Sequence, residues 1–395
     1  MRHYTARKLF LAGLIILLGL VLYLYLRPIP AIEPVAEVLA PVKTSPVAMP
    51  WPAVGQAAIG ANGYGVLETH NTGAQVSIAS IAKIITALAV LRQKPLAIGS
   101  QGPTITLDSQ DLDYFNYYYL NDGSAAKVAV GEQISEYQAL EGMLLPSANN
   151  LADSLGRWAF GSGTAYTAYA NKMLKSMGLA QTTAGGPSGF ADDTTSTAGD
   201  LVKIGLQAMA NPIIAQIVEQ PSATIPTAGE VKNLNWLLGS DGINGVKTGN
   251  TDKAGGCYLF AANRQVQGRS VLVIGAILGA SDLNNAITAA KPLLAAADSG
   301  FVLTTPVHKG QVVGTYKTPW EGSAQALATK DLSVLAWKDK DIQISDKPQP
   351  VSTPAEAGAP VGSISLQNVG LATSSSLVLS QELSGPSWRW RIFHK

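Results

Sequence analysis

Three short motifs occur in a fixed order along this chain, and one active site can contain all three only if distant segments fold together. The motifs are Ser80-Ile81-Ala82-Lys83, Ser147-Ala148-Asn149 and Lys247-Thr248-Gly249, which read as SxxK, SxN and KTG. Together they supply a nucleophile, a base, a proton relay and an anion-binding strand, which is a complete set for acyl transfer. Each motif alone occurs by chance in ordinary proteins. The presence of all three in this order is therefore what indicates an acyl-transfer site.

The first motif places a hydroxyl and an amine on one helical turn. Ser80 opens a predicted helix whose apolar residues follow helical spacing, and Lys83 three residues later faces the same side. The Lys83 amine serves as a base only if its pKa falls, and a partly buried site with a second cation, here Lys247, lowers it. The backbone N–H of Ser80 would lie in the electropositive first turn, which suits an oxyanion.

The second and third motifs supply a proton relay and substrate contacts. Ser147 directly follows a proline on a predicted tight turn, where its hydroxyl can bridge the lysines and pass a proton to the leaving group. Asn149 offers both a donor and an acceptor to a substrate amide. The KTG motif predicts a strand edge, where Lys247 and Thr248 can bind a terminal carboxylate. Gly249 lets an extended peptide approach the backbone closely.

The contexts of the three motifs resemble those of D-alanyl-D-alanine carboxypeptidases, the low-molecular-mass penicillin-binding proteins. The matching stretches are residues 79–87, 144–150 and 242–249, with further similarity at Gly189-Phe190, Ser196-Thr197-Ala198, Asp200 and residues 254–257. The resemblance covers about residues 55–300. It implies an α/β (α+β) protein with the fold of penicillin-binding proteins and β-lactamases. That fold has an antiparallel sheet with flanking helices and a helical lobe, here followed by a small C-terminal all-β domain.

The resemblance also implies a reaction and a set of site residues. Ser80 would form an acyl-enzyme with the penultimate D-Ala, releasing the terminal D-Ala, and water would then hydrolyse the acyl-enzyme. The catalytic residues would be Ser80, Lys83 and Ser147, and the substrate-binding residues Asn149, Lys247, Thr248, Gly249 and Asn250. Asn250 would supply the second oxyanion N–H, at a position that is often aromatic or histidine in the family. The implied partners are peptidoglycan pentapeptides ending in D-Ala-D-Ala and β-lactam antibiotics as covalent inhibitors, with no metal or other cofactor.

An apolar run near the N-terminus predicts a membrane anchor. Residues 9–26 are uncharged and mostly apolar, and as a helix they would extend about 27 Å, close to the hydrocarbon thickness of a bilayer. Lys8 and Arg27 bracket this run, and no convincing small-x-small cleavage site follows it. We therefore expect an uncleaved single-pass anchor in the cell membrane, with a cleaved signal peptide as the alternative. The positive-inside rule then places the catalytic domain outside the cytoplasm.

The charge balance of the rest of the chain excludes one class of partner. Residues 1–27 carry four of the 28 Lys and Arg residues and none of the 27 acidic residues. The remainder therefore holds 24 bases against 27 acids. A mildly acidic body argues against nucleic acid as a partner.

Composition divides the chain into five segments. Residues 1–27 form a cytoplasmic tip and the anchor, and the Pro/Ala-rich residues 28–52 predict an extended spacer. Residues 53–301 form the serine peptidase domain, in which strands near both ends and helices between them predict a sheet built from distant parts of the chain. Short β-prone pieces predict a small β domain over residues 302–382. For the basic, aromatic residues 383–395, a lipid-interface segment and a disordered terminus both remain open.

Three alternatives to a carboxypeptidase were weighed. A class A β-lactamase shares SxxK and KTG but needs a glutamate after the second motif to activate water. No glutamate occurs between Glu141 and Glu219, and the second motif reads SAN in place of SDN. An inactive cell-wall-binding protein is disfavoured because the nucleophile, base and anion-binding residues are intact. A DD-endopeptidase would use the same parts and stays open.

Overall fold

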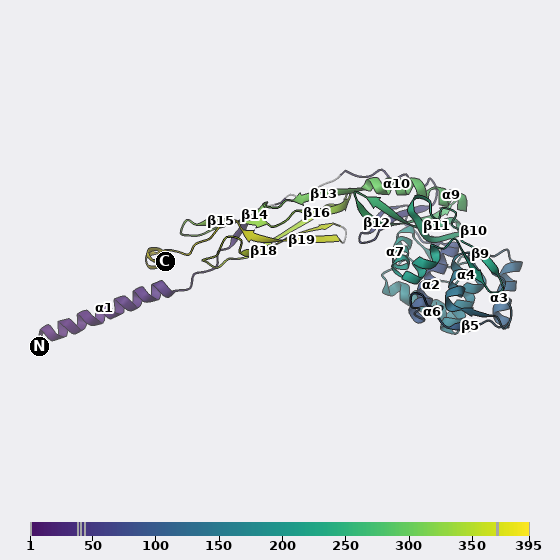
Figure 1. The fold of residues 1–395 in the computed structure, drawn as a ribbon, viewed down its shortest axis with the longest axis horizontal. Coiled ribbons are helices and arrows are strands. Elements are labelled where there is room, and N and C mark those ends of the chain that lie inside the picture. The colour runs from purple at the N-terminus through teal and green to yellow at the C-terminus, as the bar shows by residue number, and fades with distance from the viewer. Residues whose placement is uncertain (1, 38, 40–41, 43–44, 369–370, 395) are drawn as a thin grey trace. The chain divides into compact units, whose positions relative to one another are not determined.

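The chain divides into two compact units, which are described separately. The computed structural model describes residues 2–37, 39, 42, 45–368 and 371–394. The larger unit is Pro46–Val302, and the smaller unit combines Met1–Ser45 with Leu303–Lys395. The larger unit contains all three motifs, and the smaller unit is mainly β-sheet (Figure 1).

A five-stranded antiparallel sheet forms the centre of the larger unit, in the order β10-β11-β12-β2-β3. Its strands are β2 (Gln56–Ala61), β3 (Gly65–His70), β10 (Ile243–Thr251), β11 (Gly255–Val266) and β12 (Arg269–Ala280). Two strands therefore come from the start of the unit and three from its end, which confirms the predicted sheet built from distant segments. β12 lies in the middle and is almost entirely apolar and buried, as expected for a strand covered on both faces. β10, which carries KTG, is an edge strand.

Helices cover both faces of this sheet. α7 packs against β2 and β12, whereas α9 and α10 pack against β11 and β12 from the other side (Figure 1). α2 lies inside the helical lobe, because α4, α5, α6 and α7 all contact it. The helices are α2 (Ala82–Gln93), α3 (Ser109–Leu120), α4 (Glu136–Leu144), α5 (Asn149–Phe160), α6 (Gly163–Ser176), α7 (Ala198–Ala210), α8 (Pro212–Val218), α9 (Leu283–Thr288) and α10 (Ala290–Gly300).

Side-chain caps determine where several of these helices begin. Ser135 and Gln138 form a capping box at the start of α4, with both hydrogen bonds at 3.1 Å. The Thr197 side chain accepts a hydrogen bond from the Asp200 N–H and caps α7. These side chains satisfy backbone N–H groups that have no partner within the helix. α4 and α7 therefore begin directly after these capping side chains.

The smaller unit is built on a six-stranded antiparallel sheet in the order β1-β14-β15-β19-β18-β17. These strands are β1 (Pro34–Ala36), β14 (Val312–Lys317), β15 (Ser323–Ala328), β17 (Gln343–Pro348), β18 (Pro360–Asn368) and β19 (Leu371–Leu379), and β13 (Phe301–Val307) pairs separately with β16 (Leu332–Trp337). Tyr316 and Trp337 are fully buried and form part of its core. Alternating buried and exposed residues along β15 and β18 match a sheet with one covered face.

Part of the predicted spacer 28–52 belongs to this β-sheet. β1 pairs with β14 in antiparallel register, and isolated bridges join Ile32 to Val351 and Val42 to Ile342. The unpaired edge of β14 offers backbone donors and acceptors to an extended segment, and proline is tolerated on an edge strand. Within the predicted spacer, Pro34–Ala36 therefore forms a strand. Residues 38, 40–41 and 43–44 of this segment lie outside the described residues.

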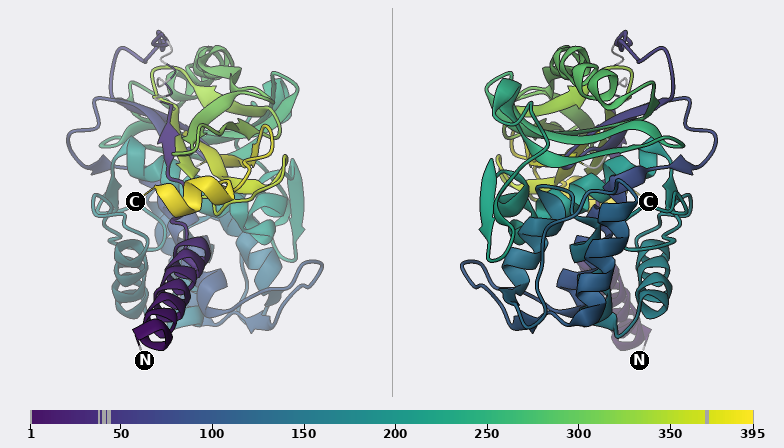
Figure 2. Two further views of the ribbon diagram at one scale, coloured as in Figure 1. Left: turned by 90° about the vertical axis from the view of Figure 1, so that its left-hand side faces the viewer. Right: turned by 90° about the vertical axis from the view of Figure 1, so that its right-hand side faces the viewer.

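The N-terminal helix and the C-terminal tail meet in the smaller unit. α1 (Arg2–Leu26) includes a stretch, Ala6–Leu26, that is long and apolar enough to cross a membrane, with none of it buried. The tail forms α11 (Trp388–Phe393) beside the end of α1 (Figure 2). Arg391 Nη1 donates to the Tyr25 carbonyl at 2.8 Å. The basic, aromatic tail is thus helical over these residues.

Candidate active site

A cleft of about 400 Å³ in the larger unit brings the three motifs together. Of the predicted site residues, Ser80, Asn149 and Asn250 line this cleft. The remaining wall residues come from the segment after α3, the loop around Phe190 and the end of β10 with the turn that follows it: Asn121, Asp122, Gly123, Ser124, Phe190, Asp192, Thr251 and Asp252. The predicted residues Lys83, Ser147, Lys247 and Thr248 are each at most 3% exposed. The site therefore has an open polar rim and a buried layer that contains two lysines.

The side chains of Ser80 and Lys83 are directly hydrogen-bonded. Ser80 lies in a 3₁₀ turn (Ala79–Ile81) that leads into α2, and Lys83 is in the first turn of α2. Lys83 Nζ lies 2.9 Å from Ser80 Oγ. It also lies 2.6 Å from Asn149 Oδ1 and 2.8 Å from the Ser188 carbonyl oxygen. The amine is thus held against the hydroxyl by groups from two other segments.

Both buried lysines have lowered pKa values. Burial lowers the pKa of Lys83 well below its ordinary value, and the nearby charge of Lys247 lowers it further, while Asp153 acts in the opposite direction. Burial also lowers the pKa of Lys247, to about 7. Desolvation penalises an ammonium more than a neutral amine. Lys83 is therefore suited to accept a proton from Ser80 near neutral pH.

Left-handed backbone conformations occur at two non-glycine residues of the site. Ala79, next to the nucleophile, has φ of 47°, and Ser147 has φ of 65°. Such conformations are unfavourable for L-residues and tend to be retained at functional sites, where the surrounding structure enforces them. At Ser147 this conformation follows directly after α4 and precedes α5, so the turn delivers its hydroxyl between two helices.

The hydroxyl of Ser147 does not bridge the two lysines in this structure. Ser147 Oγ is buried and has no hydrogen-bond partner among the described residues. Lys83 Nζ is hydrogen-bonded to three other groups, and Lys247 Nζ donates to the Thr248 carbonyl at 2.9 Å. Because these acceptors already occupy the amines, the relay predicted from the sequence is present as residues but not as hydrogen bonds.

The KTG strand lies against the turn that carries the nucleophile. A Cβ atom built on Gly249 would lie 3.0 Å from the Ser80 nitrogen and 3.1 Å from Ala79 Cβ. A side chain here would push against the turn, so glycine allows β10 to approach it this closely. Asn250, the next residue, is exposed and lines the cleft. The backbone N–H groups predicted to bind an oxyanion thus belong to two segments in contact.

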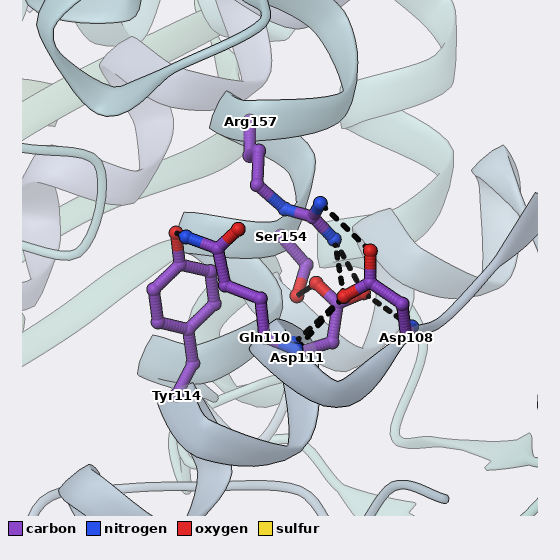
Figure 3. Close-up of polar contacts among 6 residues, drawn as sticks. All are labelled: Asp108, Gln110, Asp111, Tyr114, Ser154 and Arg157. Carbon is purple, nitrogen blue, oxygen red and sulfur yellow. Dashed lines mark hydrogen bonds and ion pairs between the residues drawn. The ribbon is translucent and has the colours of Figure 1, made fainter. Parts of the chain in front are cut away.

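An arginine joins the helix that begins at Asn149 to its neighbour α3 (Figure 3). Arg157 on α5 pairs with Asp108 at 2.9 Å and with Asp111 at 2.7 Å. Ser154 Oγ donates to Asp111 Oδ1 at 2.6 Å. Partly buried ion pairs with several charge-assisted hydrogen bonds are stronger than exposed ion pairs. This clamp fixes α5, and hence the second motif, against α3.

Several residues of the site lie outside the sequence motifs. Tyr118 Oη donates to Asp153 Oδ2 at 2.6 Å and lies 3.1 Å from Ser188 Oγ. The Tyr118 ring also packs edge-to-face on Phe190. Asp192 accepts hydrogen bonds from Ser77 and Thr251 at the rim. The only sequence signal for Asp153 was its position four residues after Asn149, on the same helical face.

Among residues 2–37, 39, 42, 45–368 and 371–394, no group of three or more His, Cys, Asp or Glu side chains could hold a metal ion. The lone Cys257 is buried, and burial raises the pKa of its thiol to about 11. It therefore packs as a small apolar side chain.

Known structures share this fold. The DD-transpeptidase of Streptomyces K15 superposes with a TM-score of 0.57 at 28% identity, over 64% of this chain and 100% of that one. Penicillin-binding protein 5 from Haemophilus influenzae superposes with a TM-score of 0.61 at 18% identity, over 86% of this chain and 100% of that one. The fold class expected from the sequence is thereby confirmed.

Sequence comparison identifies the family. The chain is 31% identical over 241 residues to a D-alanyl-D-alanine carboxypeptidase of Streptomyces sp. (strain K15), covering 56% of this chain and 79% of the relative. It is 29% identical over 203 residues to a D-alanyl-D-alanine endopeptidase of Pseudomonas aeruginosa, covering 49% of this chain and 62% of the relative. The family model described as D-alanyl-D-alanine carboxypeptidase matches residues 52–281, more than half of the chain. The chain therefore belongs to the D-alanyl-D-alanine carboxypeptidase family of serine hydrolases, peptidase family S11.

Proposed function

We propose that this protein is a membrane-anchored serine carboxypeptidase that removes the terminal D-Ala from peptidoglycan stem pentapeptides. The observation that carries the proposal is the 2.9 Å contact between Lys83 Nζ and Ser80 Oγ. A buried amine with a lowered pKa is a competent general base for a serine hydroxyl. Family membership supplies the substrate class, since relatives are named for D-alanyl-D-alanine cleavage.

In the acylation step Ser80 Oγ attacks the carbonyl carbon of the penultimate D-Ala, and its proton passes to Lys83. The resulting oxyanion accepts hydrogen bonds from the backbone N–H groups of Ser80 and Asn250. The peptide C–N bond then breaks, and the amine of the terminal D-Ala leaves with a proton passed through Ser147. This role for Ser147 requires its hydroxyl to pair with a lysine once substrate is bound, which its unpartnered, buried Oγ permits.

Substrate binding is assigned to the remaining predicted residues. The Lys247 ammonium and the Thr248 hydroxyl bind the terminal carboxylate, and Gly249 leaves room for the extended peptide along the edge strand β10. Asn149 Oδ1 already accepts a hydrogen bond from Lys83 at 2.6 Å. Its amide N–H donors therefore remain for a substrate carbonyl. β-Lactam antibiotics would acylate Ser80 in the same way and act as covalent inhibitors.

A DD-endopeptidase is the second candidate function. It would cleave a D-Ala peptide bond within a cross-link, with the same nucleophile, base and oxyanion donors. Two relatives carry this name, at 29% and 28% identity. The two functions differ in the group attached to the leaving amine, so one pair of substrates separates them.

The domain organisation and location are proposed in keeping with this function. Residues 1–27 would form a cytoplasmic tip and a single-pass anchor, and residues 53–301 the catalytic domain outside the cytoplasm. Residues 28–52 would connect them, in part as a strand of the β domain over residues 302–382. The exposed, apolar stretch Ala6–Leu26, with a mean hydropathy of 2.7, supports the anchor. The tail, residues 383–395, would lie near the membrane because α11 contacts α1.

The test uses full-length protein in detergent micelles with two substrates. One is a stem pentapeptide ending in D-Ala-D-Ala, and the other is a purified cross-linked muropeptide dimer. We expect D-Ala to be released from the pentapeptide by the wild-type protein and not by Ser80→Ala. Cleavage of the dimer alone would establish the endopeptidase instead. No cleavage of either substrate would refute both candidates.

A further inference from the structure

A carboxyl group outside the three motifs lies beside the catalytic lysine. We propose that Asp153 is a positioning residue of this site, which acts with Tyr118 and Ser188 to hold the Lys83 amine against Ser80. The proposal rests on the proposed function, because it assigns a partner to the general base. It concerns an aspartate that neither SxxK, SxN nor KTG contains.

Helix geometry directs Asp153 toward the site. It lies on α5, four residues after Asn149, and residues four apart share one face of a helix. Asn149 uses that face to accept a hydrogen bond from Lys83 Nζ at 2.6 Å. The charge of Asp153 raises the pKa of the same Lys83 amine. One helix face thus presents an amide and a carboxylate to the base.

A chain of hydrogen bonds connects Asp153 to the backbone group that holds Lys83. Tyr118 Oη donates its single proton to Asp153 Oδ2 at 2.6 Å. At the 3.1 Å contact between Tyr118 Oη and Ser188 Oγ, the serine hydroxyl must therefore be the donor. The carbonyl oxygen of Ser188 in turn accepts from Lys83 Nζ at 2.8 Å. Asp153 thus fixes the orientation of both hydroxyl groups in this series of hydrogen bonds, those of Tyr118 and Ser188.

The loop that carries Ser188 depends on the same contacts. The N–H of Phe190 donates to Ser188 Oγ at 3.3 Å. The Phe190 ring packs edge-to-face on Tyr118, with ring centroids 5.2 Å apart. Phe190 also lines the cleft. Loss of the anchor at Asp153 would therefore loosen Tyr118, the loop and the acceptor of Lys83 together.

Electrostatics give Asp153 a second effect on the base. The groups that face Asp153 are Lys83 from α2, Tyr114 and Tyr118 from α3, and Tyr166 from α6. Lys83 is faced in addition by Lys247 from β10. Burial raises the pKa of Asp153 to about 6, and the Tyr118 hydrogen bond and Lys83 oppose that rise. Near neutral pH its carboxylate therefore supplies a negative charge that acts on the Lys83 amine.

The test measures the pH dependence of Ser80 acylation by a fluorescent penicillin in full-length protein. In Asp153→Asn the ammonium form of Lys83 loses its counter-charge. The acid limb of the acylation rate should therefore move to lower pH, by about 0.5 to 1 pH unit. Asp153→Glu restores the charge and should return the limb toward its wild-type position. Tyr118→Phe keeps the carboxyl group but removes the hydrogen bond that favours its ionised form, so acylation should slow and the limb should shift in the same direction by less than in Asp153→Asn.

Asp111→Asn is the matched control. Asp111 is a buried aspartate at the α3–α5 contact, and it pairs with Ser154 and Arg157. This variant should lower the melting temperature and leave the acid limb in place. An unmoved limb in Asp153→Asn, or an equal shift in Asp111→Asn, would overturn the proposal. If Asp153→Asn does not fold, the acid limbs of Tyr118→Phe and Asp153→Glu are measured instead. Shifts of these limbs that follow only the loss of stability of each variant would overturn the proposal.

The outcome stays separate from that of the proposed function. If the wild-type protein is not acylated at Ser80, the proposed function itself fails. If the wild type is acylated and only the pH limb is insensitive to Asp153, the proposed function stands and the role of Asp153 falls.

Discussion

Lys83 Nζ lies 2.9 Å from Ser80 Oγ, and no carboxylate is among the three acceptors that surround this amine. The other two acceptors are an amide oxygen and a backbone carbonyl oxygen. All three groups are uncharged, and Lys83 is fully buried. A free amine can donate to the amide and carbonyl oxygens and accept the hydrogen bond of the Ser80 hydroxyl. A buried ammonium without a bonded counter-charge is costly, so this environment favours the free amine. The base is therefore poised to deprotonate the serine at neutral pH.

The first prediction concerns the alkaline limb of activity. The pKa of Lys247 is lowered to about 7 by burial, and only its ammonium form attracts a substrate carboxylate. We expect kcat/KM for a D-Ala-D-Ala peptide to fall above about pH 7, since this ratio reports groups of the free enzyme. Lys247→Arg keeps its charge at every working pH, so the fall should disappear even where the rate is lower. A fall that persists unchanged in Lys247→Arg would contradict the assignment.

The second prediction links this lysine to stability. Its pKa in the folded state, about 7, is below the unfolded value of 10.5. Between these values the unfolded chain binds more protons, so the free energy of unfolding should rise with pH, by about 3 kcal/mol between pH 7 and pH 9.5. Lys247→Met removes the titrating group, and its free energy of unfolding should rise less. Urea unfolding at about pH 7 and pH 9.5 measures the difference, and equal slopes would refute the prediction.

The third prediction tests the close approach of β10 to the nucleophile turn. In Gly249→Ala the new methyl group would lie 3.0 Å from the Ser80 nitrogen, which displaces the turn. Acylation of Ser80 should slow by about 10- to 100-fold, as expected for a small misplacement of reacting groups. Gly163→Ala is the control, since a Cβ there meets no atom within 4 Å. Equal acylation rates for the two variants would show that this contact does not position Ser80.

The fourth prediction concerns the clamp between α3 and α5. Arg157→Ala leaves Asp111, whose side chain is 2% exposed, without its cation. Breaking a buried pair from one side should lower the free energy of unfolding by about 2 to 4 kcal/mol. Lys291→Ala breaks an ion pair whose side chains are 49% and 48% exposed, and it should cost at most about 1 kcal/mol. Thermal denaturation of both variants decides whether the clamp is stronger than a surface pair.

Local signals explain why much of the fold was predictable. The sequence marks the starts of α4 and α7 because the capping residues Ser135 and Thr197 act on backbone groups only a few positions away. The strand runs near both ends of the catalytic unit were visible because long apolar segments leave few alternatives to a buried sheet. The motif residues themselves lie in one site, as their order along the chain suggested.

Features that depend on long-range contacts were missed. β1 forms because the edge strand β14 offers backbone hydrogen-bonding groups to it. The sequence of a Pro/Ala-rich segment does not indicate which strand it will pair with. Tyr118 and Asp153 are 35 positions apart, and Tyr118 and Ser188 are 70 apart. The left-handed φ of Ser147 is imposed by the surrounding packing, since serine has no preference for it. Tertiary structure alone reveals these features.

The central claim is that Ser80 is the nucleophile and Lys83 its base. The most direct measurement is mass spectrometry of peptides from the full-length protein after incubation with penicillin. We expect one adduct, on the peptide that contains Ser80, in the wild-type protein. In Lys83→Met this adduct should form at least about 1,000-fold more slowly, because the general base is lost. An adduct on another residue, or undiminished labelling of Ser80 in Lys83→Met, would contradict the claim.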